Sequence, residues 1–243
     1  MNRALLLLSW IGAMAWTVAA PGTPSDDLLD GYFEAIGGRD EWAAGHGEYV
    51  LAKVEDPRFA LPGTFEFCWS WDEPRTADRS RFQGLTQLRA YAGDDGWTFV
   101  RPSGDQEGTV RTWDDARRMR GQSEWTGNFE VLTHRLAKRD ERVTTRMGTG
   151  PWASWVEISV DARIVAYLLV GEGGAPRSFH RVFDGITVIF GPLAERGRIN
   201  FPAWGKFEGG EPFELIAFEI LASAPVEPFQ EPGPGDSGLL NCS

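Results

Sequence analysis

The residues of this sequence best suited to binding a ligand are aromatic side chains spaced two apart between positions 64 and 71. Successive side chains on a β-strand point to opposite faces. One face of such a strand, here named the aromatic wall, would carry Phe65, Phe67, Trp69 and Trp71. The other face, free to meet water, would carry Thr64, Glu66, Cys68 and Ser70. A wall of this size must be covered by a core, a lid or a ligand.

Two further aromatic residues, Trp97 and Phe99, alternate in the same way on a later predicted strand. The chain has 11 Trp residues, and each aromatic side chain buries about 150–250 Å². So many Trp side chains would exceed the space in a simple sheet core. We therefore predict a ligand cavity lined by the aromatic wall together with Trp97 and Phe99. An ordinary packed sheet core is the alternative.

A pair of arginines, Arg79 and Arg81, follows on the next predicted strand, and both side chains fall on one face of it. If that face is concave, their guanidinium groups could bind a ligand carboxylate or phosphate at the cavity mouth. The alternative is a solvated strand face whose arginines pair with nearby acids.

Catalysis in the same cavity would require an ionisable group with a shifted pKa facing inward. Glu66 and Asp78 are the candidates, although alternation places Glu66 on the outer face. Asp94 and Asp95 lie within a glycine-flanked turn, where exposure to water would leave them no acid–base advantage.

Motifs for metal or cofactor chemistry are missing from the sequence. His46, His134 and His180 are the only histidines, and none has a His or Cys neighbour at a ligand spacing. We place His134 and Arg135 on a solvated helix face. The sequence also lacks a Gly-x-Ser-x-Gly elbow, a phosphate loop and a dinucleotide-binding glycine motif. We therefore expect no metal, no cofactor and no enzymatic activity.

The two cysteines are Cys68 and Cys242. A disulfide between them would attach the end of the chain to the strand that carries the aromatic wall, and an oxidising compartment permits one. Two unpaired thiols are the alternative.

The N-terminal residues indicate export. A basic start at Arg3 precedes an apolar run and a set of small residues, which is typical of a signal peptide over 1–19 with cleavage after Ala19. A retained membrane anchor is the alternative, but the run is shorter than the roughly 20 residues that a spanning helix prefers. No later segment is apolar enough to span a membrane. The net charge of −11 argues against nucleic acid as a partner.

Periodicity divides the rest of the chain into elements. Helices are expected over 25–36 and 41–44, and two more between 112 and 142 with Thr112 as an N-cap. Strands are expected over 48–55, 64–72, 76–83, 88–92, 97–100, 152–161, 164–170, 178–190 and 213–221. This order predicts an α+β fold with one large antiparallel sheet and a single domain over 20–223. A largely irregular tail would follow over 224–243, which is rich in Pro and Gly.

Three segments resemble one family of exported proteins. Residues 28–38 read LLDGYFEAIGG, 91–97 read YAGDDGW, and 224–232 read APVEPFQEP. In this order they are similar to the N-terminal helix, a hairpin and the closing segment of the outer-membrane lipoprotein-sorting (LolA/LolB-like) family. The hairpin carries an extra Gly-Asp, and Ala224 stands where the family has Asn.

The resemblance implies a half-open antiparallel barrel whose concave apolar face is lidded by a few helices. Proteins of that shape carry acyl chains or other apolar ligands through the periplasm. We therefore expect a periplasmic, non-enzymatic binding or carrier protein for a hydrophobic or amphiphilic ligand, such as a lipid or a lipoprotein acyl chain, with a possible protein partner in the envelope. The alternatives are an enzyme acting on a small aromatic or apolar substrate in the same cup, and an envelope interaction protein without a ligand.

Overall fold

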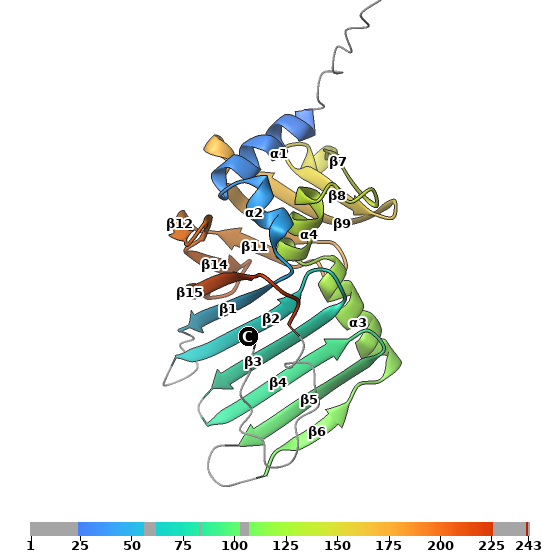
Figure 1. Ribbon diagram of the computed structural model, residues 1–243, viewed down its shortest axis with the longest axis vertical. Helices are drawn as coiled ribbons and strands as arrows, with labels where there is room; N and C mark the ends of the chain where they lie inside the picture. The colour runs from blue at the N-terminus through green and yellow to red at the C-terminus, as the bar shows by residue number, and fades with distance from the viewer. Residues whose placement is uncertain (1–23, 56–61, 83, 103–106, 226–241, 243) are drawn as a thin grey trace, which may run out of the picture.

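The computed structural model describes residues 24–55, 62–82, 84–102, 107–225 and 242 (Figure 1). The predicted signal peptide over 1–19 lies outside these residues, as does most of the predicted irregular tail. The description therefore concerns the part of the chain between the first helix and the last strand, together with Cys242.

One antiparallel sheet of 13 strands dominates the described residues. Its first half contains β1 (Gly47–Val54), β2 (Gly63–Ser70), β3 (Arg75–Phe82), β4 (Leu85–Ala92), β5 (Asp95–Pro102) and β6 (Thr109–Thr112). Its second half contains β7 (Val143–Met147), β8 (Val156–Val160), β9 (Arg163–Val170), β10 (Pro176–Arg181), β11 (Thr187–Phe190), β14 (Trp204–Phe207) and β15 (Pro212–Leu221). A separate hairpin pairs β12 (Leu193–Arg196) with β13 (Ile199–Pro202).

The strand order is β6-β5-β4-β3-β2-β1-β15-β14-β11-β10-β9-β8-β7, so the first and last strands of the chain meet in the middle of the sheet. β6 and β7 lie at its two ends, and the described strands form no closed barrel. Each half is a meander of neighbouring strands, apart from the β12–β13 hairpin that lies between the neighbours β11 and β14 in the chain. The predicted α+β class with a large antiparallel sheet is confirmed at this level.

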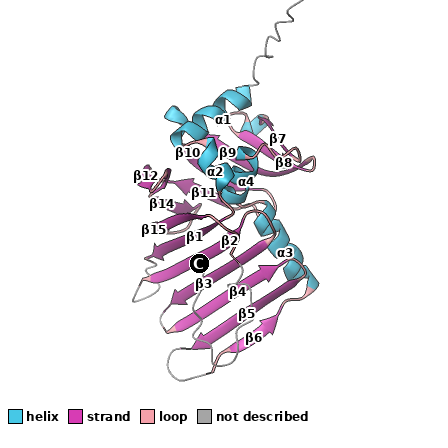
Figure 2. Cartoon of the chain, in the orientation of Figure 1, coloured by secondary structure: helices cyan, strands magenta, loops and turns pink. Residues whose placement is uncertain are grey.

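Four α-helices accompany the sheet in the described residues: α1 (Pro24–Ala35), α2 (Arg39–Ala44), α3 (Asp115–Thr126) and α4 (Phe129–Ala137). Figure 2 shows α1, α2 and α4 gathered at one end of the sheet, with α3 running past the ends of its strands. Gly37 ends the first helix at a φ of 102°, where a side chain would collide with the backbone of Ile199. Hydrogen bonds then fix the helices to one another, for example the 2.8 Å contact between Tyr32 Oη and Thr133 Oγ1.

Several element boundaries differ from the predictions. Thr112 does not cap a helix, because its backbone pairs with Trp97 at the end of β6, and the N-cap of α3 is Asp114, whose carboxylate accepts the Arg117 N–H. Trp152 belongs to a short 3-10 turn rather than to a strand. The segment 178–190 divides into β10 and β11 around a turn, and β6, β7 and β12–β14 were not predicted.

The two faces of β2 both pack against apolar residues. The aromatic wall faces the larger core, which α1, α2 and α4 cover together with β1, β8–β10 and β15. Cys68, on the other face, is fully buried in a second apolar cluster with Ala77, Leu88, Ala90, Trp97 and Phe99. The prediction that this second face meets water is therefore wrong around Cys68, because neighbouring strands place small and aromatic residues beside it.

A disulfide bond joins Cys68 to Cys242, with Cα atoms 5.9 Å apart and a sequence separation of 174. Cys242 packs against the second apolar cluster, which contains Cys68. A cross-link over such a long stretch of chain restricts the unfolded state strongly.

We predict that Cys242→Ser lowers the free energy of unfolding by about 3–5 kcal/mol, since the variant regains the entropy that the cross-link removes from the unfolded chain. Urea denaturation of the oxidised proteins measures the difference. A reductant should destabilise the wild type and leave the variant unchanged. Alkylation of both cysteines in native protein without a reductant would contradict the cross-link.

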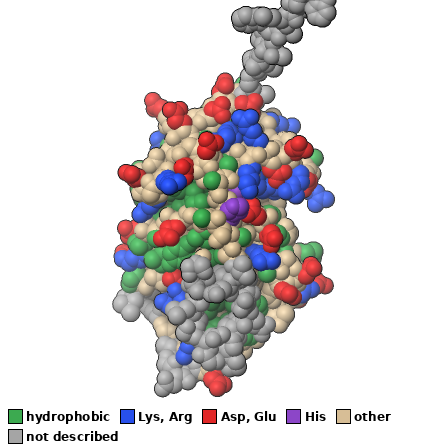
Figure 3. Space-filling model, viewed as in Figure 1, with side chains coloured by type: hydrophobic (Ala, Val, Ile, Leu, Met, Phe, Trp, Pro, Cys, Tyr) green, Lys and Arg blue, Asp and Glu red, His purple; other side chains and the backbone are tan. Residues whose placement is uncertain are grey.

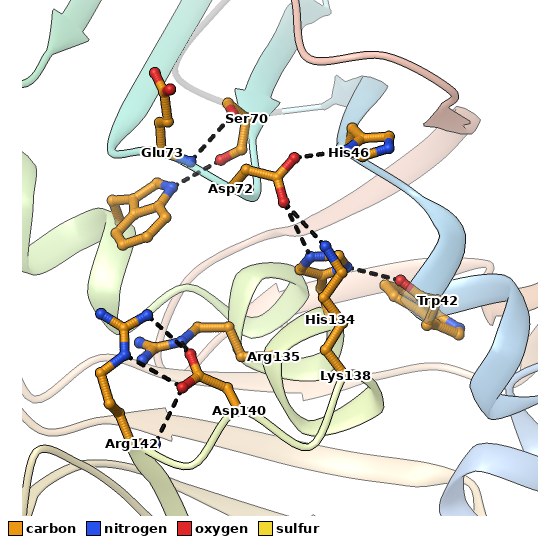
Figure 4. A network of polar contacts seen from close by, with 11 residues as sticks. Trp42, His46, Ser70, Asp72, Glu73, His134, Arg135, Lys138, Asp140 and Arg142 are labelled. Carbon is orange, nitrogen blue, oxygen red and sulfur yellow. Dashed lines mark hydrogen bonds and ion pairs between the residues drawn. The ribbon is translucent and has the colours of Figure 1, made fainter.

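Asp72, just after β2, ties the sheet to the helices (Figure 4). One carboxylate oxygen lies 2.6 Å from His46 Nδ1, and the other accepts a 3.1 Å hydrogen bond from Lys138 Nζ. Partial burial raises the pKa of Asp72, but the hydrogen bonds from His46 and Lys138 outweigh burial and hold this pKa below its ordinary value. His134 lies 3.6 Å from the same carboxylate and bonds through Nδ1 to the Trp42 carbonyl.

His134 is only 1% exposed and Arg135 only 6% exposed, so the prediction of a solvated helix face for these two residues is wrong. His134 packs its ring 5.1 Å from Trp71, and Arg135 pairs with Asp140. Specific polar partners allow both side chains to be buried, and burial lowers the pKa of His134.

We predict that Asp72→Asn destabilises the protein by about 1 kcal/mol near neutral pH, because the contacts with His46 and Lys138 lose their charge while Asp72 remains partly exposed. The carboxylate has a lowered pKa in the folded state, so its contribution is present above its unfolded pKa and is lost as the pH falls through the folded value. Urea midpoints measured across acidic pH should therefore converge for variant and wild type. The exposed hairpin variant Asp94→Asn is the control and should show no such difference.

Candidate functional site

The aromatic wall borders two connected cavities. Phe67 and Trp69 line a cavity of about 360 Å³, and Phe65 and Phe67 line a neighbouring one of about 430 Å³. The two cavities share Ala52, Phe67, Asp78, Arg89, Phe207 and Phe213. We name the pair the wall groove. It is large enough for a small apolar molecule or for part of a longer chain.

The far side of the wall groove comes from the second half of the sheet and from α4. Phe129 packs its ring 5.3 Å from Phe179 and 4.9 Å from Phe190, and all three line the cavity that contains Trp69. Four strands separate β2 from β10 in the sheet order, yet both line this cavity. The sheet must therefore bend between β2 and β10.

Trp71 has a different role from the rest of the wall. It is 1% exposed and stacks on Trp42 of α2, with ring centroids 5.4 Å apart. Its ring therefore belongs to the packed core under the helices, whereas Phe65, Phe67 and Trp69 face the groove. The wall is covered by a core at one end and lines a cavity at the other.

The remaining predicted ligand residues lie on the opposite face of the sheet. Trp97 and Phe99 pack in the cluster around Cys68. Arg79 pairs with Glu66, and Arg81 stands opposite Thr64, so both arginines share the face of Glu66. These four residues cannot line the wall groove with Phe67, because the register of β2–β5 places them on alternate positions.

Asp78 does face the groove, as the enzyme alternative required, and Glu66 does not. The Asp78 carboxylate accepts a 3.1 Å hydrogen bond from Trp69 Nε1 and forms an ion pair with Arg89. Among the arginines of β3 and β4, Arg89 thus lies on the groove side, and Arg79 and Arg81 do not. In the sequence, only the alternation of side chains along β4 could have placed Arg89 on this face. Phe67, Asp78 and Arg89 are successive cross-strand partners.

The most unusual group in the groove is Glu48 of β1, a carboxyl that is 2% exposed. Among the described residues, its Oε2 atom has no hydrogen-bond partner. Burial raises the pKa of Glu48 well above its ordinary value, and the neighbouring Glu130 carboxylate raises this pKa further. The Trp71 indole N–H offsets part of the shift.

Glu130, in the first turn of α4, is the second carboxyl of the same cavity. Burial raises its pKa to about 7, against the opposing effects of hydrogen bonds from its own backbone and Asn128 and of the Arg181 charge. Sequence reasoning missed both residues. Glu48 alternates in phase with Val50 and Ala52, which share its cavity, while Glu130 reads as an ordinary acid at a helix N-terminus.

Other features of the described residues add no second site. A hollow of about 560 Å³ lies beside β15 and contains none of the predicted ligand residues. In the described part of the chain, no group of three or more His, Cys, Asp or Glu residues is placed to hold a metal ion, and no helix is long and apolar enough to cross a membrane. On the face drawn in Figure 3, the described basic side chains are dispersed among acidic ones, and hydrophobic side chains gather over β15 and β1.

No protein-family model matches the sequence, and no curated protein matches it. The resemblance to lipoprotein-sorting proteins therefore remains a prediction, and the groove has to be interpreted from its own chemistry.

We predict that Glu48→Gln stabilises the protein by about 1–3 kcal/mol at about pH 8, because the variant removes a buried ionisable group without a full set of partners. A carboxyl with a raised folded pKa makes the wild type lose stability as the pH rises above the ordinary value of about 4.3. The advantage of the variant should therefore shrink towards about pH 5.

Urea denaturation at both pH values measures this difference, with the exposed β15 variant Glu219→Gln as the control. A Glu48→Gln variant that is less stable than the wild type at the higher pH would show that the carboxylate has a partner that the described contacts lack.

Proposed function

We propose that this chain is an exported, non-enzymatic binding or carrier protein that holds a hydrophobic or amphiphilic ligand in the wall groove. The observation that carries the proposal is the groove itself, because its two connected cavities are lined mainly by aromatic and aliphatic side chains from both halves of the sheet. Apolar cavities with a few polar groups are the usual form of small-molecule sites.

The export part of the proposal rests on the N-terminal sequence and on the disulfide. Disulfides persist in oxidising compartments such as the bacterial periplasm, and the bond between Cys68 and Cys242 fits that setting. A lipoprotein-sorting-like role for the curved sheet and its helices belongs to the same proposal, with a lipid or a lipoprotein acyl chain as the cargo.

The energetics of the groove suit a carrier. Burying about 300 Å² of apolar ligand surface at roughly 25 cal/mol per Å² gives on the order of 7 kcal/mol before ordering is counted. Micromolar or weaker affinity follows, which allows a ligand to be released to an acceptor.

A second candidate function is an enzyme acting on a small apolar substrate in the same groove. Glu48 and Glu130 favour it, since two neighbouring carboxyls with raised pKa values resemble a general acid–base pair. Turnover that depends on both carboxyls would support this candidate, whereas recovery of an unchanged ligand from the purified protein would support the carrier.

We predict that the neutral dye N-phenylnaphthylamine binds the wild type with affinity near micromolar, and that Phe67→Ala weakens binding about tenfold because it removes apolar contact in the groove. Phe99→Ala is the matched control on the opposite face. It should lower the free energy of unfolding by about 3–5 kcal/mol and leave the dye affinity of the folded protein within about twofold.

Dye fluorescence and circular dichroism measure the two effects separately. A wild-type protein that binds no apolar probe, or equal loss of affinity in both variants, would mean that the groove does not bind ligands.

A further inference from the structure

The charges that line the Trp69 cavity do not balance. Three arginines line it, and each is paired with an acid of the same lining: Arg89 with Asp78, Arg120 with Glu124 at 3.1 Å, and Arg181 with Asp184 at 2.8 Å. The lining contains two further acids and no further base. These two unmatched carboxyls are Glu48 and Glu130.

The burial of one of these two carboxyls makes the charge imbalance important. Glu48 is nearly fully buried, with a carboxyl oxygen that has no partner among the described residues. A buried polar atom without a protein partner destabilises the folded protein unless a water, an ion or a ligand group completes it. Arg181 lies near enough to Glu130 to influence it, but its charge is already matched by Asp184.

The surroundings of the two carboxyls also attract a cation. The rings of Phe129, Phe179 and Phe190 line the same cavity, and the faces of aromatic rings carry negative potential that favours positive groups. A carboxylate ligand would add a negative charge to a cavity in which the charge of each arginine is already matched by an acid. Among the described residues, only the Arg181 Nε atom is left there as a buried arginine donor without a hydrogen-bond partner.

We propose that the ligand of the wall groove is an amphiphile whose polar head is a protonated amine, with the ammonium group bound between Glu48 and Glu130 and the apolar body lying along Phe65 and Phe67. This inference rests on the proposed binding function and specifies the chemistry of its ligand. The ammonium supplies the missing charge and up to three hydrogen-bond donors, one of which reaches the unpartnered Glu48 oxygen.

Three ligands with the same ten-carbon chain test the head group: decylamine, decanol and decanoate, titrated into the full-length mature protein by calorimetry at about pH 8, where the amine is protonated and decanoate is ionised. We expect decylamine to bind about tenfold or more tightly than decanol, since hydrogen bonds to charged groups are the strong ones. Decanoate should bind more weakly than decanol.

The double variant Glu48→Gln/Glu130→Gln keeps the shape of the cavity and removes both charges. It should lose about tenfold in decylamine affinity and keep its decanol affinity within about twofold. Glu219→Gln, on the exposed side of β15, is the charge-matched control and should bind all three ligands as the wild type does.

The outcomes separate the two proposals. Decanol or decanoate binding as tightly as decylamine, or a double variant with undiminished decylamine affinity, overturns the amine inference and leaves the binding function standing. Failure of all three ligands to bind the wild type overturns the binding function and the inference with it.

Discussion

The alternation of side chains along β2 is the constraint on which the rest of the structure depends. Its wall face is aromatic, and on its other face Cys68 packs in a second apolar cluster, so the strand is covered on both sides. The second cluster and the disulfide cover one side. On the other side the helices cover the end at Trp71, and α4 together with the second half of the sheet encloses the rest as the wall groove.

Much of the first half of the fold could be predicted from local patterns. The period of β2 placed Phe65 to Trp71 on one face, and the glycines around Asp94 and Asp95 predicted the β4–β5 hairpin. Register between strands is a tertiary property that alternation within one strand does not reveal. Trp97 and Phe99 alternate as correctly as Phe67 and Trp69, yet the pairing of β2 to β5 places them on the opposite face.

The roles of the charged residues were even harder to predict from local sequence patterns. The sequence favoured Arg79 as a ligand for an anion. In the structure Glu66 lies directly opposite on β2 and pairs with this arginine. Glu48 and Glu130 are 82 residues apart in sequence, and only the closure of α4 over the sheet brings them into one cavity. No short-range motif encodes such a pair, because its chemistry comes from burial in a shared space and not from spacing along the chain.

The two ionisable clusters act on stability in opposite directions. Asp72 and His134 both have lowered pKa values in the folded state, so they favour folding at higher pH and lose that effect as the pH falls. Glu48 and Glu130 have raised values, so their effect is lost as the pH rises through their folded pKa values. The first cluster joins helices to the sheet, whereas the second places two ionisable groups in a cavity wall. Under the amine proposal, a cation bound between Glu48 and Glu130 would offset both carboxyls, and binding there would therefore stabilise the protein by linkage.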